Sequence, residues 1–437
     1  MAFDVPTTRG YYTSLSDGWT YLNGLENAQI PERVSAAVAS SFRNAPKKLK
    51  AEASSGVHAR SQEAGVSASG QMAMTARRAF ADMVGARSEN VVLGPSRHAL
   101  VEQLMTGMSR RLTLGSEVVL SRTGRPAVRV PVQRAADMFG ATERMAEADL
   151  STGELPSWQY TELVNSRTRL VVVPAADPHV GTVAPVRDIA TTVHRAAPDA
   201  WVLVDATDYA PYRLVDMAQW DADIVLIDAA VWGGPDVAAL VFRDNRMLDR
   251  LMSLALSRGA KGAHRLEVAG VAPGLLGGVA ASVQCLAELD PSSRGTRRRR
   301  LEVAMPQISD YLTSLTAHLM DSLEYLPRVH IVGGGSEDSG YDSPLGPAIF
   351  SAVPRALGVD RVPRVSFIVG EGAIPAADVV RRLMNNGVVT SSVQHGDSAL
   401  LEAMGVFEAN GAVAVGLQPF NTSSDIDQLV RGVASLG

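Results

Sequence analysis

The chain has 437 residues, of which 46% are hydrophobic and 20% are charged, as in an ordinary globular protein with an ample core. The formal net charge is −5, from 41 basic and 46 acidic residues, which argues against nucleic acid and against a membrane surface as partners. The single cysteine, Cys285, excludes an internal disulfide and a cysteine-based zinc site, and no other residue pattern indicates a metal site.

The amino terminus lacks the basic-then-apolar pattern of a signal peptide. Nowhere does the sequence approach the run of about eighteen apolar residues that a membrane-spanning helix needs. We therefore expect a cytoplasmic protein that does not bind a membrane.

Residues 1–30 predict an arm with several aromatic anchors. From residue 31 to about residue 290, short strands rich in Val and Leu alternate with amphipathic helices, which predicts an α/β domain with a mainly parallel sheet covered on both faces. The predicted helices are 71–85, the second half of 90–108, 125–141 and 186–197, and the predicted strands are the first part of 90–108, 117–121, 169–176 and 201–206.

The pattern changes near Asp290, and residues 291–437 predict a smaller α+β domain. A long helix is expected over 301–326, and the run Arg297–Arg300 before it is interpreted as its solvated first turns or, alternatively, as an anion-binding patch. Residues 333–347 are expected to form a loop without a phosphate-binding helix behind it. The remaining elements are a strand at 364–370, a helix at 375–386, a strand within 411–420 and a last helix.

The stretch 201–242 (WVLVDATDYAPYRLVDMAQWDADIVLIDAAVWGGPDVAALVF) resembles the heart of the class V aminotransferase and cysteine desulfurase family, which binds pyridoxal phosphate (PLP). Asp205 stands at the family's aspartate position, and the turn Gly234-Pro235 is in register. Gly181-Thr182 and Phe420-Asn421-Thr422 match further motifs, and the chain is most similar to the cysteine desulfurase-like branch. The resemblance implies the PLP-transferase fold type I, with a seven-stranded sheet, a small C-terminal domain and a homodimer whose site lies at the subunit boundary.

The residues that perform the family's chemistry are replaced in this sequence. The family's Ser-Gly-His-Lys, which ends in the lysine that binds PLP, is here Asp228-Ala229-Ala230-Val231. The arginine that binds the substrate carboxylate corresponds to Ala414, and an asparagine near the cofactor corresponds to Pro178. The loop that carries the desulfurase cysteine corresponds to residues 390–396, which contain no cysteine, and Cys285 lies in an apolar helix where an inert core thiol is expected.

A phosphate cradle is still conceivable at the turn before the second predicted helix. The resemblance places Ser96, Arg97 and His98 where the family's helix start holds the cofactor phosphate through amides and the helix dipole. The alternative is an ordinary turn in which Ser96 is the N-cap. Asp228 stands where the family has a phosphate-contacting serine, and like charges about 4 Å apart repel by about 4 kcal/mol at an effective dielectric constant of about 20.

The resemblance assigns three further residues to the cofactor ring. Asp205 would pair with the pyridine nitrogen, although it is equally the kind of residue that caps a turn at a strand end. Asp208 replaces a residue that contacts the phenolic oxygen, where a negative charge is unfavourable. Arg125 would stack on the ring through its guanidinium, unless the alignment slips by one residue to Pro126.

Another lysine would have to replace the missing one. Lys47, Lys48 and Lys50 lie in a polar stretch and are expected to face solvent. Lys261 lies in a loop that in the family reaches across the dimer interface, and it is the one substitute that we consider. His264 and Arg265 beside it are interpreted as a solvated loop or, alternatively, as an anion contact.

Two hypotheses follow for function. The first is a catalytically degenerate homodimer with a ligand-binding or regulatory role, whose vacated pocket (Ser96, Arg97, His98, Asp205, Asp208, Asp228) holds another ligand. The second is a working PLP-dependent aminotransferase-like enzyme that acts on an amino acid, with PLP bound non-covalently or through Lys261. Open space beside Ser96 and Arg97 favours the second hypothesis, whereas side chains of Asp228 and Trp232 filling that space favour the first.

Overall fold

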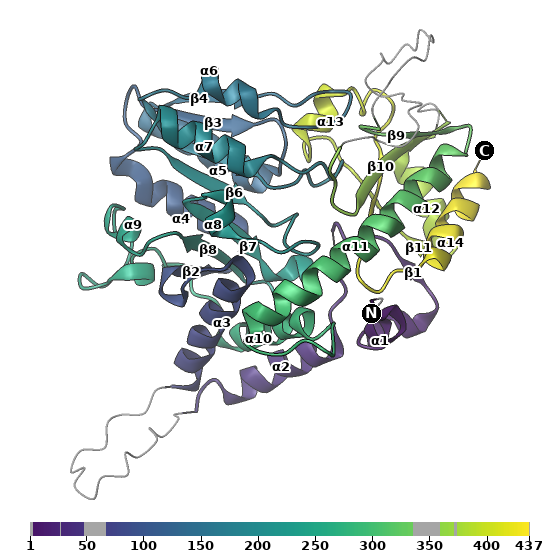
Figure 1. The fold of residues 1–437 in the computed structure, drawn as a ribbon, viewed down its shortest axis with the longest axis horizontal. Coiled ribbons are helices and arrows are strands. Elements are labelled where there is room, and N and C mark those ends of the chain that lie inside the picture. The colour runs from purple at the N-terminus through teal and green to yellow at the C-terminus, as the bar shows by residue number, and fades with distance from the viewer. Residues whose placement is uncertain (1–2, 27, 48–66, 335–358, 371–373, 437) are drawn as a thin grey trace, which may run out of the picture.

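The computed structural model describes the chain except for residues 1–2, 27, 48–66, 335–358, 371–373 and 437. Its largest element is a seven-stranded sheet in the order β2-β8-β7-β6-β5-β3-β4 (Figure 1). Only β8 runs antiparallel to its neighbours, which confirms the predicted α/β fold with a mainly parallel sheet. The strands are β2 (Val91–Gly94), β3 (Glu117–Ser121), β4 (Thr142–Ala146), β5 (Thr168–Pro174), β6 (Trp201–Asp205), β7 (Ile224–Asp228) and β8 (Ala238–Phe242).

Alternate residues of the central strands feed two separate apolar cores, one on each face of the sheet. In β6, Val202 and Val204 belong to one core, whereas Trp201 and Leu203 belong to the other. Helices cover both faces, which is why the strands are apolar on both sides. The first core includes α3 (Ala68–Val84), α6 (Tyr160–Leu163), α7 (Val186–Ala196), α8 (Met217–Trp220) and α10 (Pro273–Ala287), and the second includes α4 (Arg97–Gly107), α5 (Pro126–Phe139) and α9 (Arg246–Asp249).

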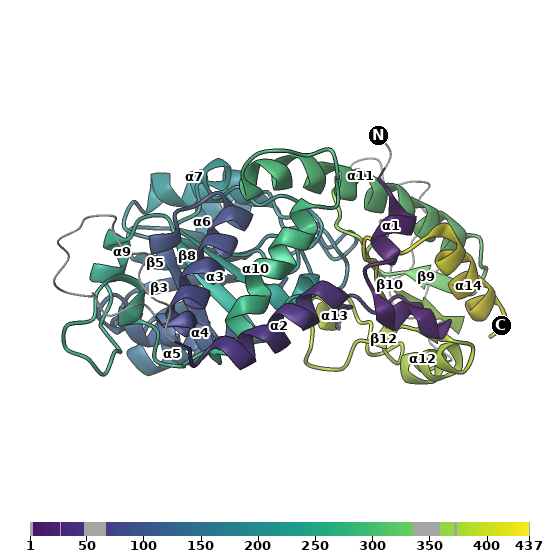
Figure 2. The ribbon, with the colours of Figure 1, turned by 90° about the horizontal axis from the view of Figure 1, so that it is seen from below.

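The C-terminal part contains an antiparallel four-stranded sheet in the order β12-β13-β10-β9. The long helix α11 (Arg297–Glu324) contacts both α3 and β9, and it runs along the molecule from the large sheet to the small one (Figure 2). The other elements are β9 (Val329–Ile331), β10 (Arg364–Val369), α12 (Ala376–Asn385), β11 (Val388–Val389), β12 (Ser391–Ser392), α13 (Ala399–Ala403), β13 (Val413–Gly416) and α14 (Ser423–Ala434). The domain boundaries near residues 30 and 290 stay predictions, and most of the expected loop 333–347 lies outside the described residues.

The N-terminal segment joins the two sheets. After α1 (Val5–Arg9), β1 (Thr20–Tyr21) pairs in parallel with β11, and α2 (Glu32–Asn44) packs against α10. Between them, Gly24 approaches β13 so closely that a Cβ would lie 2.8 Å from the carbonyl oxygen of Gly416. This close approach holds Gly24 against the small sheet. Short 3₁₀ helices complete the described elements. The helix η1 (Thr13–Asp17) follows α1. The others lie in the large-sheet region and are η2 (Ser88–Asn90), η3 (Met108–Arg110), η4 (Ser157–Gln159), η5 (Ala229–Trp232) and η6 (Gly262–Arg265).

The arginine run does begin a helix, capped by Thr296, but the expectation that its side chains are solvated is wrong for three of the four. Arg299 is 71% exposed, whereas the side chains of the other three are 16–20% exposed because neighbouring elements present carboxylates to them. The pairs are Arg297 with Asp82, Arg298 with Asp216 and Arg300 with Glu288.

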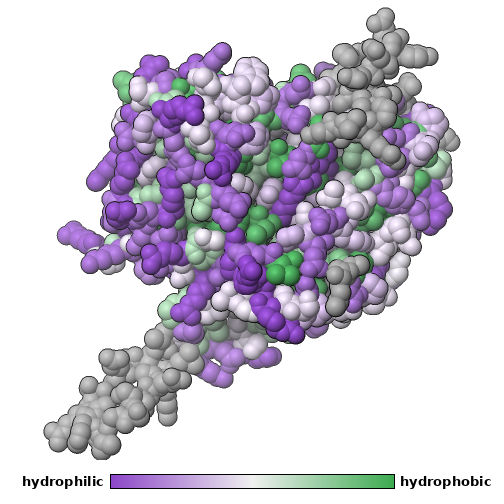
Figure 3. Space-filling view, viewed as in Figure 1, coloured by the Kyte–Doolittle hydropathy of each residue, from purple (hydrophilic) through white to green (hydrophobic). Residues whose placement is uncertain are grey.

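The surface of the molecule is mainly polar on the face shown in Figure 3, with apolar side chains in small separate spots. Among the described residues, none of the helices combines the length and apolar character that a membrane crossing requires. Within the same residues, no group of three His, Cys, Asp or Glu side chains is placed to hold a metal ion.

Candidate ligand cavity

A cavity of about 370 Å³ opens where β2 and β7 end. Open α/β sheets bind ligands beyond the carboxyl ends of their strands, and the volume lies within the range of about 300–1,000 Å³ that is usual for small-molecule sites. The N-terminal segment, the start of α4 and the turn after β7 form its walls. The lining residues are Gly24, Leu25, Glu26, Ala28, Ser96, Arg97, His98, Ala127, Asp228, Ala230, Val231 and Asp236.

The start of α4 is an ordinary capped helix terminus. The Oγ atom of Ser96 accepts a hydrogen bond from the amide of Ala99 at 3.2 Å, so the N-cap interpretation describes its present contact. His98 is exposed, and its ring lies 3.6 Å from Glu102 and 3.3 Å from the carbonyl oxygen of Ala127. The positive end of the helix dipole nevertheless faces the cavity.

Arg97 is the one arginine in the cavity wall, and it forms no ion pair with any carboxylate in the described part of the chain. Its Nη1 atom is buried and has no hydrogen-bond partner among those residues. Its positive charge nevertheless affects the pKa of the neighbouring carboxyl groups. Burial raises the pKa of Asp205 and of Asp228, and the positive charge of Arg97 opposes both increases.

The turn after β7 places Asp228 and Val231 at the cavity. Oδ1 of Asp228 accepts a hydrogen bond from the amide of Ala230 at 3.1 Å, so the carboxylate caps the turn η5. No hydrogen bond from a described residue reaches Oδ2 of Asp228. The side chain of Val231 is half-buried and lines the cavity at the position where the resemblance implies a lysine.

Trp232 does not fill this space. Its indole Nε1 donates to Ser282 Oγ at 3.1 Å, and its ring meets the edge of Phe80 in the core. Of the two residues whose side chains would have closed the cavity, Asp228 stands in its wall and Trp232 points away. The space beside Ser96 and Arg97 is therefore open.

The lysines that the structure describes lie elsewhere. Lys261 is exposed just before η6 and does not line the cavity, and Lys47 donates to Asn44 at 2.8 Å. Lys48 and Lys50 lie outside the described residues. Beside Lys261, His264 pairs with Glu267, and Arg265 donates to the carbonyl oxygens of Leu248 and Leu251, so these two side chains already have protein partners.

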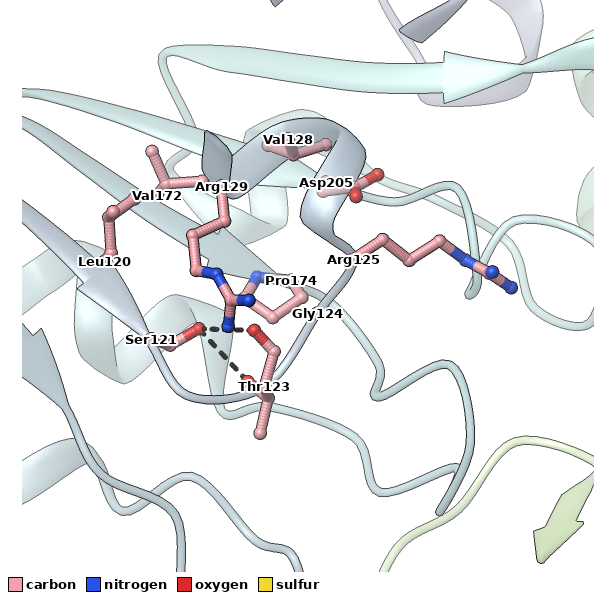
Figure 4. A pocket seen from close by; sticks show the side chains of 10 residues that line it. All are labelled: Leu120, Ser121, Thr123, Gly124, Arg125, Val128, Arg129, Val172, Pro174 and Asp205. Carbon is pink, nitrogen blue, oxygen red and sulfur yellow. Dashed lines mark hydrogen bonds between the residues drawn. The ribbon is translucent and has the colours of Figure 1, made fainter. Parts of the chain in front are cut away.

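Asp205 and Arg125 line a second, small cavity of about 20 Å³ (Figure 4). Asp205 is buried at the end of β6, where Oδ1 accepts from the amide of Thr207 at 3.0 Å and from its hydroxyl. Its observed contact is thus the turn cap that the sequence left as an alternative. Figure 4 shows the guanidinium of Arg125 directed away from the other lining residues.

Arg125 instead belongs to a buried ion-pair network with Asp208 and Arg364. Its Nε lies 3.0 Å from Oδ2 of Asp208, and Nη1 of Arg364 lies 2.8 Å from Oδ1. Burial alone would raise the pKa of Asp208, but the positive charges of Arg125, Arg364 and Arg97 hold it well below its ordinary value. Arg125 therefore contacts a carboxylate rather than a free space for a planar ring.

Arg364 was not found from the sequence. It begins β10, is completely buried and also donates to the carbonyl oxygen of Pro178 at 3.0 Å, while its Nε and Nη2 have no partner among the described residues. In the small sheet Ser366 pairs with Ala414, so Arg364 stands on the strand beside the position of the family's carboxylate-binding arginine. The available signal was a charged residue at the start of a strand that is otherwise apolar.

The family model described as "Aminotransferase class-V" matches residues 20–257 of the chain. The chain belongs to this family. It is 38% identical to the "Uncharacterized protein MT3887" of Mycobacterium tuberculosis, over the full length of both. It is 24% identical to the "Aminotransferase-like protein FGM3" of Gibberella zeae, over 81% of this chain and 80% of that one, and 22% identical to a cysteine desulfurase of Enterobacter sp., over 94% and 92%.

Solved structures of other proteins share the fold. The cysteine desulfurase of Thermococcus onnurineus superposes with a TM-score of 0.79 at 18% identity, covering 100% of this chain and 99% of that one. The cysteine desulfurase CsdA of Escherichia coli gives 0.76 at 20% identity, covering 100% and 98%. A variant of the protein C-DES, with glycine covalently linked to its PLP cofactor, gives 0.70 at 18% identity, covering 98% and 99%.

PLP is the cofactor of this class V family, but the residues of this chain do not fit a covalently attached PLP. A valine occupies the lysine position, and no described lysine lines the cavity. The free oxygen of Asp228 would face the cofactor phosphate, and the guanidinium of Arg125 is held by Asp208. Asp205 retains the family identity, and it is buried beside Thr207.

Proposed function

We propose that this chain is a class V aminotransferase-family protein that has lost PLP-dependent catalysis and acts as a ligand-binding or regulatory homodimer. The observation that supports this most directly is Val231, which presents an aliphatic side chain to the cavity where the cofactor lysine belongs. An isopropyl group can neither attack a carbonyl nor carry a proton. The cavity keeps the size of a small-molecule site while the reactive group is absent from its described wall.

Two further replacements support the same proposal. Ala414 is completely buried in β13, so that strand offers no guanidinium for a substrate carboxylate. Residues 390–396 contain no cysteine, and Cys285 lies in α10, where burial raises the pKa of its thiol. Because cofactor attachment, substrate binding and sulfur transfer rely on different residues, the loss of all three favours a changed function over a single altered step.

The alternative function is an enzyme that uses PLP without covalent attachment, or attached to Lys261. A specific observation favours it, because the cavity beside Ser96 and Arg97 is open and Asp205 remains at the end of β6. Against it, Lys261 does not line the cavity within one chain, and Asp228 places a carboxyl group at the phosphate position.

The deciding experiment is an absorbance titration of the purified protein with PLP, followed by borohydride reduction and peptide mass mapping. We expect neither a shifted cofactor band nor a reduced adduct on any peptide. An adduct on the peptide that contains Lys261 would overturn the proposal, and so would saturable PLP binding at micromolar concentration without an adduct. Light scattering after size exclusion tests the homodimer, which predicts twice the chain mass of 46.3 kDa.

A further inference from the structure

We propose that the small cavity beside Arg129 binds one monatomic anion of the size of chloride. The cavity lies at the start of α5, where Ser121, Thr123 and Arg129 are among the residues that line it (Figure 4). It shares no lining residue with the larger cavity at the ends of β2 and β7. The inference therefore goes beyond the proposed function, and it holds whether or not PLP-dependent catalysis has been lost.

Arg129 carries a positive charge that has no counter-ion among the described residues. Its guanidinium forms neither an ion pair nor a hydrogen bond with any of them. The side chain is half-buried, and this burial lowers its pKa. The charges of Glu402 and Glu143 oppose the decrease from a distance, whereas the charge of Arg122 adds to it. A partly buried guanidinium without a partner is unfavourable, and an anion from solution would supply the missing contact.

The turn between β3 and α5 supplies further donors. The Oγ atom of Ser121 lies 3.1 Å from Oγ1 of Thr123 and 3.2 Å from the carbonyl oxygen of the same residue. When Ser121 donates its single proton within this turn, the hydroxyl group of Thr123 is free to donate to a ligand. The N-cap of α5, Arg125, makes no side-chain capping bond, so the positive end of the helix dipole also lies at this turn without a cap.

Asp205 is the one carboxylic acid among the residues that line the cavity. Figure 4 shows its carboxylate directed away from the guanidinium of Arg129. Its Oδ1 atom is occupied by Thr207, and burial raises its pKa, which favours the neutral form. Apolar side chains form much of the remaining wall and strengthen the attraction between Arg129 and an anion, because they exclude water from the cavity. They belong to Leu120, Val128, Val172 and Pro174.

The volume of the cavity, about 20 Å³, restricts the ligand to one ion or one molecule of about the size of water. A single water molecule needs about 10–15 Å³ of such space. Phosphate, sulfate and organic carboxylates are larger and do not fit. Of the species that fit, a halide forms a charge-assisted contact with Arg129, whereas a neutral water molecule leaves the charge uncompensated. A bound chloride ion would therefore neutralise Arg129 and stabilise the start of α5.

The first test is chloride NMR of the full-length protein, because exchange between solution and a protein site broadens the chloride signal. We expect the protein to broaden the signal, and we expect added bromide, which competes for the same site, to narrow it again. Gluconate at the same ionic strength is too large for the cavity and should not compete. A chloride signal that the protein leaves unchanged, or that gluconate narrows as strongly as bromide does, would overturn the proposal.

Variants assign the binding to this cavity. Arg129→Met removes the charge but keeps an unbranched side chain, and it should remove the broadening that bromide reverses. The matched control is Arg134→Met in the same helix, because the side chain of Arg134 is 53% exposed and pairs with Glu102. This control should broaden the signal as the wild type does. Thr123→Val removes one donor and should weaken chloride binding by about threefold to tenfold. Circular dichroism verifies that each variant is folded, and wild-type broadening by folded Arg129→Met would overturn the assignment.

A measurement on the wild-type protein alone gives the position of the ion. In crystals grown with sodium bromide, the anomalous signal of bromide should lie within contact distance of Arg129 and Thr123. An ordered water molecule at this position, without an anomalous signal, would overturn the proposal.

Discussion

Asp208 and Arg364 join the two sheets through a contact of 2.8 Å between Oδ1 and Nη1. Asp208 lies in the turn that follows β6 in the large sheet, and Arg364 is the first residue of β10 in the small one. Both side chains are buried, at 3% and 0% exposure, and Arg125 donates to both oxygens of the same carboxylate. The network therefore fixes the small sheet against the site in the absence of any ligand.

The first prediction is that Asp208→Ala destabilises the protein strongly, by about 3–5 kcal/mol, because it leaves two arginines buried without a counter-ion. Arg364→Met should cost less, since Asp208 keeps Arg125 and a methionine fills much of the same volume. Chemical denaturation followed by circular dichroism measures both values. An Asp208→Ala loss equal to or smaller than that of Arg364→Met would show that the network does not hold the sheets together.

The second prediction concerns His194 in α7, whose two ring nitrogens lie 2.9 Å from Asp223 and from Asp221. Hydrogen bonding to Asp223, and then to Asp221, raises the pKa of His194 above its ordinary value despite partial burial. A raised pKa means that the folded state binds the proton more tightly. The stabilisation is therefore complete below the unfolded pKa of about 6.5 and is lost as the pH rises through the higher folded pKa.

His194→Gln is the variant that measures this dependence, because glutamine keeps a hydrogen-bonding side chain without a titratable charge. The difference in unfolding free energy between the wild type and this variant should be larger at about pH 6 than at about pH 9. The matched control is His318→Gln, whose ring is 44% exposed and 3.6 Å from Asp427. A difference for His194→Gln that does not change with pH would contradict the assigned pKa shift.

The third prediction tests why the site no longer fits PLP. The single variant Val231→Lys should bind PLP only weakly. The new ammonium group would lie close to Asp228, and the cofactor phosphate would still face that carboxylate. The double variant Val231→Lys, Asp228→Ser should bind PLP and give a borohydride-stable adduct at residue 231. Absorbance titration and peptide mapping compare the two. Equal PLP binding by the single and double variants would mean that Asp228 is not an obstacle.

Much of the large sheet was predictable because its strands are short, apolar and bounded by amphipathic helices. Alternating residues such as Val202 and Leu203 pack on opposite faces of the sheet, so each strand must be apolar on both sides. This apolar run is visible in the local sequence. The position of Val231 was equally predictable, because the neighbouring Asp205 and Gly234-Pro235 fix the register of the resemblance.

The ion-pair network was not predictable, because its members are far apart in the chain. Arg125 and Asp208 are 83 residues apart, and Arg364 joins them only because Gly181, with φ of +84°, lets the turn after β5 approach β10. A Cβ on Gly181 would lie 2.8 Å from the carbonyl oxygens of Val362 and Arg364. The solvated interpretation of Arg297–Arg300 was wrong for the same reason, since carboxylates of distant elements meet three of these arginines.

The fourth prediction concerns Glu267, which connects three elements near the first strand of the sheet. Its carboxylate receives two hydrogen bonds from Arg77 of α3, at 2.6 and 2.7 Å, and a third from the amide of Leu93 in β2 at 2.8 Å. The side chains of Arg77 and Glu267 are only 14% and 15% exposed, so solvent screens the ion pair only partly. Glu267→Gln keeps the shape but removes the charge and one acceptor, and we expect a loss of about 1–3 kcal/mol of unfolding free energy by urea denaturation. Glu302→Gln, which alters the ion pairs of a more exposed carboxylate with Arg298 and Arg299 at the start of α11, serves as the control and should cost less than about 1 kcal/mol. If the two variants are equally stable, the bidentate pair contributes no more than a surface contact.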